Sequence, residues 1–135
     1  MDSRTKNPTT LPKKRRGCVQ TTRSPRLGEV WDVEFDPVTE HEQGGQRSAL
    51  VISNDRFNHT RNGFCIVVPI TTKNRGIRLH IPIGPPEGGL TLPSVILPDQ
   101  AKSVSQLRAR KFRGEVTLQT LRRVQAVVGR FIDRE

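Results

Sequence analysis

The chain has only two cysteines and no long hydrophobic run, and these two features limit the classes of protein to which it can belong. Cys18 and Cys65 are not spaced like zinc ligands, and Cys65 lies within the apolar run FCIVVPI. We therefore expect Cys65 to be a buried free thiol in a reducing compartment. No segment approaches the roughly 18 apolar residues that span a bilayer. The N-terminus also lacks the apolar core of a secretion signal, so the sequence predicts a soluble, cytoplasmic protein.

The short motifs of common metal and nucleotide enzymes are missing as well. The sequence contains no HExxH or CxxC, no phosphate-binding loop, no GxSxG and no dinucleotide-binding glycine fingerprint. His41, His59 and His80 show no metal-ligand spacing with one another or with a cysteine. We therefore predict that the protein uses no metal and no cofactor.

Acidic residues are few, since 13 Asp and Glu stand against 23 Lys and Arg, for a net charge of +10. Such an excess indicates a nucleic-acid partner, because Lys and Arg displace counterions from phosphates. Most of the charge is N-terminal: residues 1–27 hold eight basic residues against one acid, or +7, which leaves +3 for residues 28–135. Residues 1–26 are polar and contain the run KKRR. We predict a disordered basic tail there, either a solvated segment without a specific role or a non-specific RNA tether.

Residues 27–135 have the pattern of one small domain rich in strands. GEVWDVEF (28–35) alternates, with Trp31, Val33 and Phe35 on one face, as a half-buried strand does. Further strands are expected at SALVIS (48–53), FCIVVPIT (64–71), RLHIPI (78–83), SVIL (94–97) and in a short piece after Asp99. The run FCIVVPIT is nearly all apolar, as a central strand would be. Five or six short strands with tight connections favour a small barrel over a βαβ fold.

The C-terminal segment follows a different period. TLQTLRRVQAVVGRFI (117–132) repeats apolar residues at intervals of three and four, as an amphipathic helix does. Thr117 is the expected N-cap, because its hydroxyl can accept a hydrogen bond from the first turn. The predicted fold is therefore mainly β, a small β-barrel with a C-terminal α-helix.

Polar groups suited to phosphate stand where apolar strands begin or end. Arg47 follows the flexible pair Gly44-Gly45 and precedes an apolar strand, and its guanidinium offers a planar fork of donors. Thr71 ends the most hydrophobic strand, with Lys73 and Arg75 just beyond it. His41 lies in the same loop as the glycine pair and can transfer protons. Each pattern alone also fits an ordinary turn or strand end.

The order of these segments is more specific than any one of them. GEVWDVEFDP, HEQGGQR, SALVISND, VVPIT and SVILPDQ together strongly resemble the MazF/PemK/Kid family of toxin endoribonucleases, from about Leu27 to the end of the chain. The resemblance implies an SH3-like barrel of the CcdB/Kid/MazF type, paired into a symmetric homodimer. It also implies a type II toxin that cuts single-stranded RNA such as mRNA at a short sequence motif. That cleavage needs no metal and leaves 2′,3′-cyclic phosphate and 5′-hydroxyl ends.

The resemblance places the active centre at Arg47 and Thr71. Both side chains can donate to the extra negative charge of a phosphorane-like transition state, where one donor is typically worth roughly 10²–10³ in rate. The Kid branch of the family adds an acid–base pair that falls on His41 and Asp99. The RNA-binding positions that we predict are Glu42, Gln43, Asn54, Lys73, Arg75, Gln100 and Lys102.

Three positions depart from the family pattern. Leu97 stands where the Kid branch has an arginine, and Ser48 stands where proline is usual. Lys102 replaces an arginine, which keeps the charge but loses the bidentate fork. These changes bear on cleavage specificity and on how the acid and base roles are divided.

The resemblance also implies a protein partner, a cognate antitoxin with an acidic flexible segment. A groove lined by Arg47, Lys73, Arg75 and Lys102 suits such a segment. Two alternatives use the same fold: a CcdB-like poison of DNA gyrase, and a nucleic-acid-binding module without catalysis. The presence of both Arg47 and Thr71 favours the nuclease.

Overall fold

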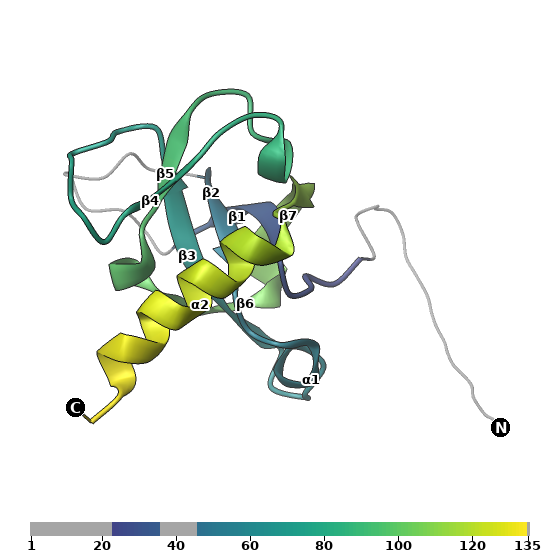
Figure 1. Cartoon of the computed structure of the whole chain (residues 1–135). Helices are drawn as coiled ribbons and strands as arrows, with labels where there is room; N and C mark the ends of the chain where they lie inside the picture. Colours follow the sequence, from purple (N-terminus) through teal and green to yellow (C-terminus); the bar gives the residue numbers. More distant parts are fainter. Residues whose placement is uncertain (1–22, 36–45, 135) are drawn as a thin grey trace, which may run out of the picture.

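Seven strands and one long helix dominate residues 23–35 and 46–134, which are the residues that the computed structural model describes (Figure 1). The strands are β1 (Glu29–Glu34), β2 (Gln46–Val51), β3 (Phe64–Thr71), β4 (Ile81–Ile83), β5 (Ser94–Ile96), β6 (Lys102–Ser105) and β7 (Ala109–Glu115). The helices are α1 (Asp55–Asn58) and α2 (Leu118–Ile132), and three 3₁₀ turns are η1 (Glu87–Gly89), η2 (Pro98–Gln100) and η3 (Gln106–Arg108).

The strands form one antiparallel sheet in the order β4-β5-β3-β2-β1-β7, and β6 also pairs with β3. The nearly all-apolar β3 therefore pairs with three other strands, which confirms the prediction of a central strand. Within the described residues the edge strands β4 and β7 do not pair with each other. The sheet is therefore barrel-like but is not a closed barrel. The prediction of a mainly β fold with a C-terminal helix is confirmed.

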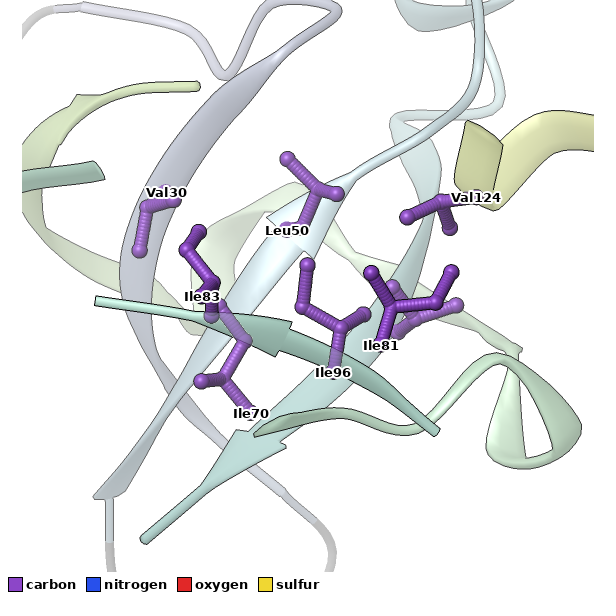
Figure 2. Packing of buried hydrophobic residues seen from close by; sticks show 8 residues of the cluster. Val30, Leu50, Ile70, Ile81, Ile83, Ile96 and Val124 are labelled. Atoms are coloured by element: carbon purple, nitrogen blue, oxygen red, sulfur yellow. The ribbon is translucent and has the colours of Figure 1, made fainter. Parts of the chain in front are cut away.

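Strand alternation divides the apolar side chains between two cores. One core lies between the sheet and α2, and Figure 2 shows its side chains pointing toward one another from five strands and the helix. Its members are Val30, Leu50, Val68, Ile70, Ile81, Ile83, Ile96 and Val124. The second core lies on the other face of the sheet and consists of Trp31, Val33, Ala49, Val51, Cys65, Val67, Val104 and Ala109, with Phe35 and Phe112 packed against it. Burial of each large apolar side chain contributes about 1.5–3 kcal/mol.

Helix α2 begins where the sequence predicts. The Thr117 hydroxyl accepts a hydrogen bond from the backbone N–H of Thr120 at 3.2 Å. Leu121 and Val124 bury the apolar face of the helix against the sheet. The Glu87 carboxylate of η1 in turn accepts hydrogen bonds from the Thr117 N–H at 2.9 Å and hydroxyl at 3.1 Å. The cap thus ties the helix to the turn between β4 and β5.

Several element boundaries differ from the sequence predictions. Strand β2 begins at Gln46, so Arg47 lies inside a strand rather than in the loop before it. Only Ile81–Ile83 of the predicted strand 78–83 is a strand, because the His80 N–H bonds back to the Ile77 carbonyl in a turn. Helix α1 and strand β7 were not predicted at all. The segment ARKFRGE of β7 is charged because an edge strand leaves much of its surface in solvent.

Residues 23–26 of the predicted tail pack on the domain, whereas residues 1–22 lie outside the described part of the chain. The Glu29 carboxylate is 2% exposed and accepts hydrogen bonds from the Trp31 indole and the Arg26 N–H, both at 2.9 Å. It also pairs with the Arg23 guanidinium, which lies 4.2 Å from the centre of the Phe112 ring. A buried carboxylate therefore anchors the start of the domain.

Candidate active site

Arg47 and Thr71 lie on neighbouring strands of the sheet. Arg47 of β2 is half-buried and stands opposite Val33 of β1. On the other side of β2, the pairing with β3 ends at Ala49, opposite Pro69, and the same register continued by two residues would place Arg47 opposite Thr71. Residues opposite each other on adjacent strands project from the same face of a sheet. That continued register would make the two residues predicted as the active centre neighbours at one end of that face.

A cavity of about 260 Å³ lies beside Arg47. It is lined by Phe35, Arg47, Pro69, Gln100, Ala101 and Lys102. These residues come from the end of β1, the start of β2, the middle of β3 and the η2–β6 segment. We call this cavity the Arg47 pocket. It brings together three predicted site residues, Arg47, Gln100 and Lys102, that are up to 55 positions apart in the sequence.

Phe35 and Pro69 give the Arg47 pocket an apolar wall that sequence reasoning did not assign to the site. The Lys102 ammonium nitrogen lies 5.2 Å from the centre of the Phe35 ring, which is within the range of a cation–π contact. Phe35 was predicted only as one of three apolar residues on a strand face. The sequence signal that could have pointed to Phe35 is its position as the last apolar residue on that strand face, where the strand ends.

Lys73 and Arg75 follow Thr71 on an exposed segment. The Lys73 N–H donates to the Thr71 hydroxyl oxygen at 3.2 Å, which leaves the hydroxyl hydrogen able to donate elsewhere. Thr72 and Asn74 of this segment line a second cavity, of about 490 Å³, that also borders η1 and β5. Lys73 and Arg75 themselves line neither this cavity nor the Arg47 pocket.

Asp99 lies in η2, next to Gln100, and contacts a histidine that was not predicted as a site residue. Its Oδ1 is 3.3 Å from Nε2 of His80, whose side chain is only 6% exposed against 42% for Asp99. The resemblance to the Kid branch pairs Asp99 with His41 instead, and His41 lies outside the described residues. Glu42 and Gln43 lie outside them too.

Asn54 lies away from the Arg47 pocket, which is lined by Arg47, Gln100 and Lys102 among the predicted site residues. It follows β2 at the end opposite Arg47, and strands rise about 3.3 Å per residue. Its side chain caps α1 by accepting a hydrogen bond from the Phe57 N–H at 2.9 Å. This cap explains Asn54 without any contact to a ligand.

The thiol of Cys65 is buried in the second core, as the sequence predicts. Burial raises the pKa of this thiol to about 11, so the thiolate is scarce near neutral pH. Cys65 is therefore a packing residue rather than a nucleophile. Within residues 23–35 and 46–134, no three His, Cys, Asp or Glu side chains are grouped so that they could hold a metal ion.

Comparison with known proteins identifies the family. Residues 26–132 match the model of the PemK-like, MazF-like toxin of type II toxin-antitoxin systems. The chain belongs to this toxin family. It is 31% identical over 105 residues to the endoribonuclease toxin MazF of Escherichia coli strain K12, covering 77% of this chain and 90% of that protein. It is 36% identical over 88 residues to the endoribonuclease EndoA of Bacillus subtilis strain 168, covering 62% of this chain and 72% of that protein.

Solved structures of the same family share the fold. MazF from Deinococcus radiodurans matches with a TM-score of 0.69 and 26% identity, covering 82% of this chain and 97% of that one. A MazE–MazF structure from the same organism matches with a TM-score of 0.66 and 23% identity, covering 84% and 99%. None of the helices in the described part of this toxin has the length and apolar character needed to cross a membrane.

Proposed function

We propose that this PemK/MazF-type toxin is a metal-independent endoribonuclease that cuts single-stranded RNA, mRNA included, at a short sequence motif in the cytoplasm. The observation that carries the proposal is the position of Arg47 on the wall of the Arg47 pocket, with Thr71 at the end of the adjacent strand β3. Its relatives in Escherichia coli and Bacillus subtilis are named endoribonucleases, which supports the same activity here.

The proposed reaction is an attack by the ribose 2′-hydroxyl on the adjacent phosphorus. The 2′-oxygen forms a bond to phosphorus while the bond from phosphorus to the 5′-oxygen breaks. A base takes the proton of the 2′-hydroxyl, and an acid gives a proton to the leaving 5′-oxygen. The products are a 2′,3′-cyclic phosphate and a 5′-hydroxyl, and DNA is excluded because it has no 2′-hydroxyl.

Arg47 and Thr71 would stabilise the negative charge that develops on the phosphate. In a phosphorane-like transition state the non-bridging oxygens carry extra negative charge, which a guanidinium and a hydroxyl donor stabilise. The start of β2 and the end of β3 hold both side chains, so little reorganisation is needed when RNA binds. We assign the acid–base steps to His41 and Asp99, with Asp99 one residue from the pocket wall at Gln100.

The Arg47 pocket suits one nucleotide of a single strand. Phe35 and Pro69 offer apolar surface against which a base can stack, and the Gln100 amide can bond to a base edge. Lys102, together with Lys73 and Arg75 on the segment after Thr71, supplies charge for neighbouring phosphates. Asn54 has no place in this pocket and keeps only its helix-capping role.

We propose two protein partners, a second copy of this chain and a cognate antitoxin. A homodimer would place two such basic surfaces side by side, and an acidic flexible segment of a cognate antitoxin would compete with RNA for them. A solved structure of an endoribonuclease in complex with its cognate antitoxin, from a Mycobacterial species, supports a partner of this kind.

The deciding experiment is incubation of the purified full chain with a long RNA in EDTA, followed by mapping of the new 5′ ends and their end groups. We expect cuts at one recurrent motif, with 5′-hydroxyl ends. Arg47→Ala should lower the rate by roughly 10²–10³-fold. Arg123→Ala, on the exposed side of α2, is the matched control and should cut like the wild type.

Two results would reject the proposal. Intact RNA after this incubation would leave a binding protein, either a CcdB-like gyrase poison or a silent nucleic-acid module, which supercoiling and RNA-binding assays would then separate. Cleavage unchanged in Arg47→Ala would show that another centre cuts the RNA.

A further inference from the structure

His80 is a buried polar side chain that the proposed reaction does not yet use. Its ring is 6% exposed, and both ring nitrogens are buried without an aligned hydrogen bond to any described residue. Nε2 nevertheless lies 3.3 Å from Oδ1 of Asp99. Burying a polar ring with neither nitrogen bonded costs free energy, so a small rotation that forms the Nε2–Asp99 hydrogen bond is favoured.

Asp99 connects this histidine to the Arg47 pocket. The η2 turn that contains Asp99 is only three residues long, and the next residues, Gln100 to Lys102, line the pocket. The turn is held at its start by the Leu97 N–H, which donates to the Pro69 carbonyl at 2.9 Å. A shift of Asp99 would therefore also move the pocket wall.

The pair joins the turn before β4 to the η2 turn after β5. His80 ends the turn before β4, and its own N–H bonds to the Ile77 carbonyl at 3.0 Å. Strand β4 pairs with β5 through Ile81 and Ile96, so His80 is held beside the start of η2. The backbone of His80 is thus held by its neighbours, whereas the Asp99 side chain is 42% exposed.

We infer that His80 is a positioning residue, which holds the Asp99 carboxylate and, through η2, the pocket wall that begins at Gln100. This inference rests on the proposed function, since it assigns His80 to the same RNA-cleaving site. The ring does not touch RNA. It restricts the rotamers of Asp99, so that one oxygen bonds to Nε2 and the other faces the substrate.

The first test compares His80→Leu, which removes the donor, with His80→Gln, whose amide can replace Nε2. On a short RNA that contains a mapped cleavage motif, His80→Leu should lower kcat by about 10²-fold with KM nearly unchanged, as for a misplaced catalytic group. His80→Gln should recover most of the loss. His59→Gln, which changes an exposed histidine at the end of α1, is the matched control and should keep wild-type kcat.

The second test asks whether His80 acts through Asp99. Asp99→Asn should lower kcat alone, and adding His80→Leu to it should cause no further loss, because the two side chains act as one unit. Independent, multiplying losses would mean that His80 serves the fold or another group, and would overturn the inference. Wild-type kcat in His80→Leu would overturn it as well.

A readout besides activity covers the case in which His80→Leu does not fold. In ¹H–¹⁵N spectra of the imidazole rings, Asp99→Asn should move the resonance of the His80 Nε2 and leave that of His59 in place. No change at His80 would overturn the contact. If the wild type does not cut RNA, the proposed function is rejected instead. The spectra and the cleavage assay therefore distinguish failure of this inference from failure of the proposed function.

Discussion

The ammonium nitrogen of Lys102 lies 5.2 Å from the centre of the Phe35 ring on the wall of the Arg47 pocket. A ring and a cation at this spacing can share one nucleotide, since the ring stacks on the base and the cation pairs with a phosphate. The two contributions can be separated, because stacking is insensitive to salt and phosphate contacts are not.

Phe35→Leu tests the stacking surface. Base–aromatic stacking is worth about 1–3 kcal/mol per base, so we expect KM for a cleavable RNA to rise about tenfold, with a smaller change in kcat. Steady-state cleavage assays measure both. Phe57→Leu in α1 is the matched control and should leave KM unchanged. An unaltered KM in Phe35→Leu would remove the ring from RNA binding.

Lys102→Gln tests the phosphate contact. Each phosphate paired on a single strand contributes about −0.7 to the slope of log K against log salt. The magnitude of the slope for RNA binding should therefore fall by about 0.7 in this variant, as measured by fluorescence anisotropy between low and moderate salt. Lys111→Gln, on the exposed side of β7, serves as control. Equal slopes in the wild type and Lys102→Gln would exclude that contact.

Glu87 links stability to pH through the cap of α2. Burial acts to raise the pKa of this carboxyl, but hydrogen bonds from Thr117 and Thr120 outweigh it and lower the pKa below its usual 4.5. The folded state thus holds the proton more weakly than the unfolded chain, and the contribution to stability is present above about pH 4.5. It is lost as the pH falls through the lowered folded-state value.

Glu87→Gln should accordingly lower the free energy of unfolding by about 1 kcal/mol at pH 7, a value kept small because the carboxyl is partly exposed. The difference from the wild type should shrink below pH 4.5. Urea unfolding at pH 7 and below pH 4.5 measures this difference in the free energy of unfolding. Glu115→Gln, at an exposed strand position, is the control. A difference independent of pH would refute the role of the ionised cap.

Among the described glycines, Gly89 of η1 leaves the least room for a Cβ atom. Its φ is +69°, and a Cβ there would lie 2.0 Å from the Arg113 carbonyl oxygen of β7. Gly89→Ala should therefore cost about 3 kcal/mol, because neither the backbone angle nor the neighbouring backbone can accommodate a methyl group. Gly129→Ala in α2 meets nothing within 4 Å and should instead stabilise by about 0.5–1 kcal/mol. Thermal unfolding of the two variants should show shifts of opposite sign.

The predicted elements that the structure confirms are those whose patterns are local. Strand β3 was predicted with its observed ends, because an apolar run of eight residues has few alternatives to a buried strand. The β7 segment was missed because an edge strand needs no apolar alternation, and the strand predicted over 78–83 lost its first half to a turn. A local sequence pattern does not show whether a neighbouring strand is available to pair with the segment.

By itself, the sequence predicted the mainly β class and the Thr117 cap of α2, both of which the structure confirms, and it led to the proposal of Arg47 and Thr71 as a catalytic pair. Each follows from residue types at short spacings or from the order of segments along the chain. Only the tertiary structure decided that Phe35 and Lys102 share a pocket and that Asp99 lies against His80. The physical reason is that ladder register and core packing bring together residues far apart in sequence, and no local periodicity encodes which residues these are.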